Sequence, residues 1–269
     1  MPRHCYLLVE GPHDVAFAGR FLKLRKLKMK TTLNTVSPFW YEGGRLIPRS
    51  FPVNRQGDFH KRTGIPSFFE DAEVSVAIHN GGGLENLPSF LEESIKILGG
   101  VQTLSAVGVL LDADSDESPA QRFAQLKRDT PMLGMLNSLG DVNEIGGVRL
   151  GVFVLPNNRD IGTMETVLSQ CAEAVYPELL SLANRYIQEV KSDPKYVKEL
   201  SKESASLKAI IGVMANVFRP GKSNEVSIQD QDWISNKSAA VEGVQLFDSF
   251  LGELLGLQTP PPKIDPPQG

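Results

Sequence analysis

The sequence predicts an α/β protein with a four-stranded, mostly parallel sheet, flanking helices and a helical C-terminal extension. Short apolar runs alternate with helical patterns from residue 5 to about residue 170. The runs are apolar on both faces, as strands in the middle of a parallel sheet are. Strands that alternate with helices are typical of a sheet covered by helices on both sides. Beyond residue 170 the spacing of apolar residues is helical throughout.

Each predicted strand is followed by a turn and a helix. The helix after the first strand carries Asp14 as its expected cap. The second strand leads into Gly81 to Gly83, and this order of strand, glycine-rich turn and helix is the crossover unit of parallel sheets. The expected strands are 5–10, 74–79, 106–111 and 148–155, and the expected helices are 15–27, 84–98, 119–127, 131–138 and one from about 163.

The chain divides into three parts by composition. We expect an α/β domain over 1–170, with an insertion around 31–70 that includes a β-prone stretch, 31–36, and a hairpin and loop within 39–54. Apolar stripes at helical spacing over 171–257 predict a helical extension packed on that domain. The proline-rich segment 258–269 is expected to be a disordered tail.

Composition narrows the class of protein. Two cysteines among 269 residues are too few for a disulfide framework. No apolar run approaches the roughly 20 residues of a membrane span, and the N-terminus has no signal peptide pattern, so we expect a cytoplasmic protein without a membrane partner. The net charge is −4, yet residues 20–62 hold eleven Lys and Arg against two acidic residues, a local balance of +9. Such a segment suits a polyanion, although a solvated helix face explains it as well.

Three carboxylates at alternate positions end the third predicted strand. Asp112 and Asp114 follow the apolar run from Val107, and Asp116 follows in the loop. Alternate side chains of a strand point to one face, and like charges at close range are best tolerated around a cation. Glu10 ends the first strand, and the carboxyl ends of parallel strands meet at one edge of a sheet. Hard oxygen ligands of this kind predict a Mg²⁺ or Mn²⁺ site with Glu10, Asp112, Asp114 and Asp116 as ligands.

Other polar or small residues at strand ends are candidates for substrate binding. Glycines let a phosphate approach the backbone, and an arginine in a loop can clamp one. The predicted substrate-binding residues are Gly11, Asn80, Gly81, Gly82 and Arg159.

These motifs, Leu8-Val-Glu10-Gly11 and the later Asp112-x-Asp114, make the chain resemble the TOPRIM domain of topoisomerases, primases and OLD-type nucleases. The resemblance covers residues 5 to about 170 and implies a Rossmann-like sheet. It also implies that Asp112 and Asp114 bind Mg²⁺ and that Glu10 acts as a catalytic acid or base. The chain is most similar to small stand-alone TOPRIM-like proteins of bacteria and archaea. It lacks the winged-helix tyrosine of topoisomerases, the zinc module of many primases and the ATPase domain of OLD proteins, so the module would act alone or with a separate protein partner.

Competing interpretations of the same residues are weaker or stay open. An EF-hand loop would need Gly at position 117 and Glu at position 123, where Glu117 and Phe123 stand. A P-loop around Gly221-Lys222 lacks its first glycine and a preceding strand. The aspartates alone would also suit a solvated loop. Glu165 is either a further ligand or an acidic residue at a helix start, and His79 borders the site or belongs to the core.

The sequence therefore predicts a Mg²⁺-dependent phosphoryl-transfer protein, foremost a nuclease on DNA or RNA. Glu10, Asp112 and Asp114 are the predicted catalytic residues, and the basic segment would follow the nucleic-acid backbone. The alternative is a catalytically weak module that binds metal, nucleotide or a partner protein. A phosphatase or phosphotransferase on small molecules is a third possibility, and the chain could form a homodimer.

Overall fold

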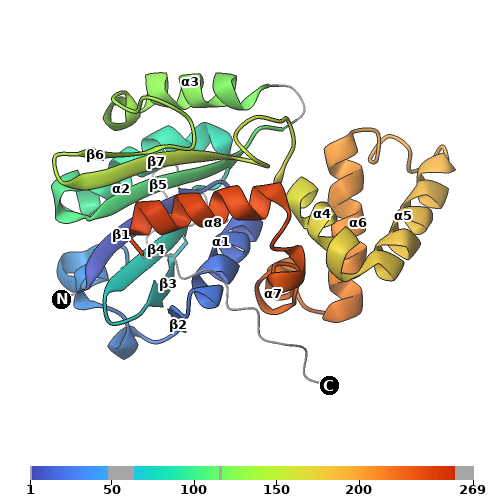
Figure 1. Cartoon of the computed structure of the whole chain (residues 1–269), viewed down its shortest axis with the longest axis horizontal. Coiled ribbons are helices and arrows are strands. Elements are labelled where there is room, and N and C mark those ends of the chain that lie inside the picture. Colours follow the sequence, from blue (N-terminus) through green and yellow to red (C-terminus); the bar gives the residue numbers. More distant parts are fainter. Residues whose placement is uncertain (1, 48–63, 115–116, 258–269) are drawn as a thin grey trace.

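A seven-stranded mixed sheet forms the centre of the protein (Figure 1). The computed structural model describes residues 2–47, 64–114 and 117–257. The strand order is β2-β3-β4-β1-β5-β7-β6, and the four strands β4, β1, β5 and β7 run parallel. The strands are β1 Arg3–Val9, β2 Lys28–Lys30, β3 Ser67–Glu70, β4 Val74–Asn80, β5 Ala106–Asp112, β6 Val142–Ile145 and β7 Val148–Leu155.

The α/β class is confirmed, but the prediction of four strands is wrong. The four predicted strands are the parallel ones, β1, β4, β5 and β7. Three further strands, β2, β3 and β6, pair antiparallel at the two sides of the sheet. They are three or four residues long, and β2 is Lys-Met-Lys. Three or four residues are too few for an alternating pattern to be recognised, and only pairing with a neighbour makes such a stretch a strand.

Helices cover both faces of the sheet and enclose two separate apolar cores. On one face, α1 and α8 share a core with odd-numbered residues of β1 such as Leu7, and on the other face α2 and α3 share a core with even-numbered ones such as Leu8. The helices are α1 Pro12–Leu24, α2 Leu87–Ile97, α3 Pro119–Asp129, α4 Met164–Val175, α5 Pro177–Ser192, α6 Glu203–Phe218, α7 Asn224–Asp230 and α8 Glu242–Leu255.

Glycines in the central strands make room for α8. A Cβ atom on Gly108 would lie 2.5 Å from Cδ2 of Leu254, and one on Gly151 would lie 2.7 Å from Cε2 of Phe250. Real atoms do not approach so closely, so these two glycines let the last helix lie directly on β5 and β7. The last helix, α8, thus completes the apolar core to which β1 and α1 also belong.

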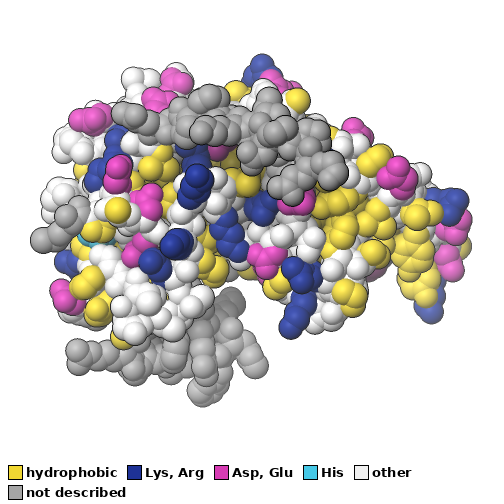
Figure 2. Space-filling view, turned by 60° about the horizontal axis from the view of Figure 1, so that its bottom comes forward, with side chains coloured by type: hydrophobic (Ala, Val, Ile, Leu, Met, Phe, Trp, Pro, Cys, Tyr) yellow, Lys and Arg dark blue, Asp and Glu magenta, His cyan; other side chains and the backbone are white. Residues whose placement is uncertain are grey.

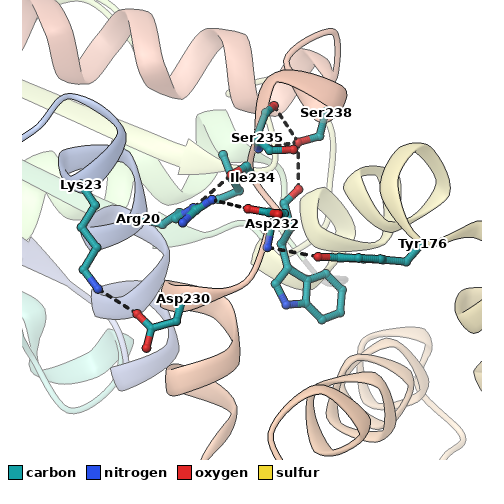
Figure 3. Close-up of polar contacts among 9 residues, drawn as sticks. Arg20, Lys23, Tyr176, Asp230, Asp232, Ile234, Ser235 and Ser238 are labelled. Atoms are coloured by element: carbon teal, nitrogen blue, oxygen red, sulfur yellow. Dashed lines mark hydrogen bonds and ion pairs between the residues drawn. The ribbon is translucent and has the colours of Figure 1, made fainter. Parts of the chain in front are cut away.

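The rest of the C-terminal part forms a helical lobe, α4 to α6, beside the sheet, with α7 between the lobe and α1 (Figure 1). Polar contacts join α1 to the end of α7 and to the segment that follows it (Figure 3). Arg20 pairs with Asp232 at 3.1 Å and donates to the carbonyl of Ile234, and Lys23 pairs with Asp230 at 2.8 Å. Next to them, the hydroxyl of Tyr176 accepts the backbone N–H of Asp232 at 3.1 Å.

In the described part of the predicted insertion, a 3₁₀ turn lies within the expected β-prone stretch 31–36, two more turns follow before residue 48, and β3 lies at the end; the hairpin and loop expected within 39–54 fall partly outside the described residues. The turns are Leu33–Thr35, Pro38–Trp40 and Glu42–Gly44, and residues 48–63 lie outside the described residues. Buried polar groups decide this conformation. Trp40 Nε1 donates to Ser75 Oγ at 2.6 Å, and Ser75 Oγ donates to Glu70 Oε1 at 2.6 Å, which fixes the turns on the sheet.

His79 is a core histidine with both ring nitrogens bonded. It is 2% exposed. Its Nε2 lies 2.8 Å from the carbonyl oxygen of Gly64, so Nε2 carries the proton, and its Nδ1 accepts the hydroxyl of Tyr6 at 2.9 Å. Burial, partly opposed by the bond to Gly64, lowers the pKa of His79 to about 4.

This histidine predicts a loss of stability in acid. The unfolded chain binds a proton at an ordinary pKa near 6.5, whereas the folded protein does so only near 4. Between these values the unfolded state binds more protons, so the free energy of unfolding falls as the pH falls. We expect wild type to lose on the order of 3 kcal/mol more than His79→Phe over this window, measured by urea unfolding at several pH values. Parallel pH profiles for the two proteins would contradict this expectation.

None of the helices in the described part of the chain has the length and apolar character needed to cross a membrane.

Candidate active site

The carboxyl ends of the four parallel strands lie together at one edge of the sheet. In the pairing register, Val9 is opposite both Asn80 of β4 and Leu110 of β5, and Asp112 is opposite Leu155 of β7. The residues that follow these strand ends are therefore neighbours in space, although they lie far apart in sequence. This is the edge at which ligands bind in open parallel sheets.

Glu10 and Asp112 lie next to each other at this edge. Oε2 of Glu10 is 3.5 Å from the backbone nitrogen of Asp112. Asp112 is 9% exposed, and its Oδ1 accepts the backbone N–H of Met164, the first residue of α4, at 2.9 Å. The carboxylate of Asp112 thus connects β5 with the start of α4. The carboxylate of Glu10, the residue directly after β1, lies next to it.

Asp114 is held by its backbone as well as by its side chain. Its φ of 61° lies in the left-handed region, which Asp tolerates better than most residues. It exchanges two backbone hydrogen bonds with Gly162, at 2.9 and 3.0 Å. Its carboxylate pairs with Arg122 of α3 at 3.3 Å. The fourth predicted ligand, Asp116, lies outside the described residues.

Two more buried carboxylates join this group: Asp14, which the sequence predicted only as a helix cap, and Glu165, which it left open between a further ligand and an acidic residue at a helix start. Asp14 is 7% exposed and Glu165 is 3% exposed, and both interact electrostatically with Asp112. The cap of α1 is Gly11 and not Asp14 as predicted, because Asp14 stands at the third position of the helix and accepts the N–H of Gly11 at 2.8 Å. Glu165 lies in the first turn of α4 and accepts the hydroxyl of Thr163 at 2.8 Å.

The like charges of this acidic cluster, defined as Glu10, Asp14, Asp112, Asp114 and Glu165, perturb one another. Burial, together with the charges of Asp14, Glu165 and Glu10, holds the pKa of Asp112 well above its usual range. Burial and the charges of Glu10 and Glu165 raise the pKa of Asp14 to about 7. Burial and Asp114 raise the pKa of Glu10. A positive charge placed here would relieve this repulsion.

A histidine and a lysine border the cluster. His13 lies between two carboxylates, with Nδ1 3.9 Å from Glu165 and Nε2 4.0 Å from Glu225 of α7. Its interaction with Glu165 raises the pKa of His13 in spite of partial burial. Burial alone would raise the pKa of Glu165, but His13 and Thr163 outweigh it and the pKa is lowered. Lys208 of α6, exposed to solvent, also favours the ionised forms of Glu10 and Glu165.

The predicted substrate-binding residues of the first two turns lie at the same edge, but their backbone N–H groups already have partners. The N–H of Gly11 donates to Asp14 and that of Gly81 to the carbonyl of Val9. The N–H of Gly82 donates to the side chain of Asn80 at 2.9 Å. These turns offer a phosphate room to approach, but no unpaired glycine N–H.

Arg159 and much of the basic segment are also engaged within the chain. Arg159 pairs with Glu242 at the start of α8. Besides Arg20 and Lys23, Arg25 binds Asp248 of α8 at 2.9 Å. Lys26 and Lys28 are exposed, and Arg49, Arg55, Lys61 and Arg62 lie outside the described residues. Part of the local positive charge therefore fastens α1 to the C-terminal part and is not available to a polyanion.

The cluster suits a hard cation by the type of its donors. Carboxylate oxygens are preferred Mg²⁺ ligands, and buried carboxylates of raised pKa lack a compensating charge. Among the residues that the structure describes, however, no group of three or more His, Cys, Asp or Glu side chains is arranged to hold a metal ion. The cluster therefore fits Mg²⁺ by the chemical type of its oxygen donors and not by their arrangement. Glu10, Asp112 and Asp114 would hold the ion, with Asp14 and Glu165 beside them.

The fold and this edge define the class: an α/β protein whose parallel strands end in a buried carboxylate cluster. The chain belongs to the family described as Protein of unknown function (DUF3226), whose model matches residues 5–254. Its fold is similar to that of the hypothetical protein PH0156 from Pyrococcus horikoshii OT3. That crystal structure has a TM-score of 0.51 and 15% sequence identity, over 94% of this chain and 95% of the other. No curated protein matches the sequence.

Proposed function

We propose that this protein is a Mg²⁺-dependent nuclease of TOPRIM type that hydrolyses DNA or RNA phosphodiesters. The observation that carries the proposal is the meeting of Glu10 and Asp112, 102 positions apart in sequence, at the carboxyl edge of the sheet. Asp14 and Glu165 add two more buried carboxylates at the same place. Mutual repulsion among buried acids lowers stability unless a cation or a proton compensates it.

Each residue of the cluster has a role in this proposal. The bound Mg²⁺ would neutralise charge on the scissile phosphate and favour ionisation of a water. Asp112 and Asp114 would hold the ion, and Glu10, whose pKa is raised, would be a ligand from the other side or the base that accepts a proton from the attacking water. His13, held near Glu165, is suited to return a proton to the leaving oxygen. Lys208 attracts the phosphate backbone from the side of α6.

A module that binds a metal or nucleotide without turnover is the second candidate. The backbone N–H groups at Gly11, Gly81 and Gly82 are satisfied within the chain, and Arg20, Lys23 and Arg25 pair with acidic residues. Both facts reduce the surface available for a long polyanion. A mononucleotide needs fewer such contacts than a polymer does.

Cleavage assays with the full chain separate these candidates. Supercoiled DNA, single-stranded DNA, RNA and mononucleotides would each be incubated with Mg²⁺, with Mn²⁺ and with EDTA. Metal-dependent cutting of a polymer supports the nuclease. Binding of Mg²⁺ and short oligonucleotides by calorimetry, without turnover of any polymer, supports the binder. Turnover of mononucleotides alone would instead indicate a small-molecule phosphatase.

We also expect Mg²⁺ to stabilise the folded protein. An ion that binds only the folded state at one hundred times its dissociation constant adds about 2.7 kcal/mol to the free energy of unfolding. Thermal unfolding followed by circular dichroism would show a higher Tm in MgCl₂ than in NaCl of equal ionic strength. The same Tm in both salts would contradict a metal site at the cluster.

A further inference from the structure

The outer face of α5 and α6 exposes apolar side chains. Leu182 and Tyr186 of α5 are 53% and 55% exposed, and Val217 of α6 is 59% exposed. Leu182 and Tyr186 are four residues apart and share one side of their helix. Hydrophobic side chains gather on the helical lobe at the right of Figure 2. Apolar side chains grouped and exposed in this way suit an interaction surface.

This face is hollowed as well as apolar. A shallow groove of about 500 Å³ runs between the two helices and is lined by Tyr186, Gly212, Val213, Asn216 and Val217. Gly212 has no side chain, so another backbone or an inserted side chain can come close to α6 there. The groove therefore suits an inserted apolar or aromatic side chain.

Two charges of α5, Arg185 directly before Tyr186 and Glu189 one turn further on, indicate what the face would bind. Arg185 and Glu189 are exposed, and neither forms an ion pair with a described residue. They are four residues apart in the order Arg then Glu, which is the less favourable order for a pair within one helix. If two copies of α5 meet antiparallel about a two-fold axis near position 187, Arg185 of each copy faces Glu189 of the other. The surface is thus complementary to itself in charge.

We propose that the α5–α6 face binds a second copy of this chain in an isologous homodimer. Tyr186 of each protomer would enter the groove of its partner, and two Arg185–Glu189 pairs would flank the contact. The helix α5 has 16 residues and is about 24 Å long, which can span a patch of standard interface size. Aromatic side chains at the centre and charge pairs at the rim are the usual order of such interfaces.

Sedimentation velocity of the full chain across micromolar concentrations tests the proposal. We expect a dimer whose dissociation constant rises about tenfold or more in Tyr186→Glu. Arg185→Glu and Glu189→Arg would each weaken the dimer, and the double variant Arg185→Glu/Glu189→Arg would restore it. Ile97→Glu, on α2 and 52% exposed, is the matched control and would leave the dimer unchanged.

Circular dichroism would confirm that each variant folds, and the two charge variants do not disturb apolar packing. A wild-type chain that stays monomeric at all these concentrations would overturn the proposal and leave the face to another partner. A dimer that is unaffected by Tyr186→Glu, or charge variants that fail to restore each other, would also overturn it.

Discussion

The variant Asp112→Asn is expected to lower the rate of Mg²⁺-dependent cleavage by about a hundredfold to a thousandfold. Asn keeps an oxygen that can accept the N–H of Met164, so the link to α4 is preserved. It removes the negative charge that the proposed Mg²⁺ ion would bind. The rates of wild type and variant would be compared on the substrate that wild type cuts fastest.

The same substitution is expected to lower activity without lowering thermal stability, and the Tm therefore serves as a check on folding. Asp112 is buried among Asp14, Glu165 and Glu10, so loss of its charge relieves repulsion when no metal is present. We expect Asp112→Asn to have a Tm in EDTA at least as high as that of wild type, and a smaller rise in Tm with Mg²⁺. Asp129→Asn, at the exposed end of α3, is the control for an aspartate outside the cluster. Full activity in a folded Asp112→Asn protein would remove Asp112 from the mechanism.

The variant Phe247→Ala is expected to lower the free energy of unfolding by about 3–5 kcal/mol, which is the usual cost of such a cavity in a core. Phe247 is fully buried. Its ring lies 4.9 Å from that of Phe21 and 5.2 Å from that of Phe153, measured between centroids, so it joins α8 to both α1 and β7. Urea unfolding followed by tryptophan fluorescence would measure the loss.

The neighbouring variant Leu246→Ala is the matched control. Leu246 is 38% exposed on the same helix, and its truncation should change the free energy of unfolding by about 0.5 kcal/mol or less. Similar losses for the two variants would mean that α8 does not depend on the aromatic core for its place on the sheet.

The central fold could be predicted because its signal is local. β5, Ala106–Asp112, is buried along its whole length, and a continuous apolar run bounded by turn residues indicates such a strand in any sequence. The same argument located β1, β4 and β7. It missed β2, β3 and β6 because a strand of three or four residues depends on its neighbour for hydrogen bonds.

The site could be predicted in part, for a similar reason. Glu10 and Asp112 follow parallel strands, so the rule that strand ends share an edge was enough to bring them together. Asp14 and Glu165 stand in the first turns of helices, where an acidic residue is common for local reasons. Asp14 joins the site only because α1 docks against these strand ends, and the docking of α4 brings Glu165, which the sequence left open as a ligand, to the same place. Lys208 comes from α6, whose position no local pattern reveals.

By itself the sequence determined the parallel centre of the sheet and the carboxylates at its edge, because period, burial and turn chemistry act over a few residues. Only the tertiary structure decided which charged side chains are paired within the chain and which are available to bind a partner. It directs Arg20, Lys23 and Arg25 to acidic partners in the C-terminal part and leaves Arg185 and Glu189 without partners among the described residues. Pairing between distant charges depends on how helices pack, and packing is a property of the whole folded chain.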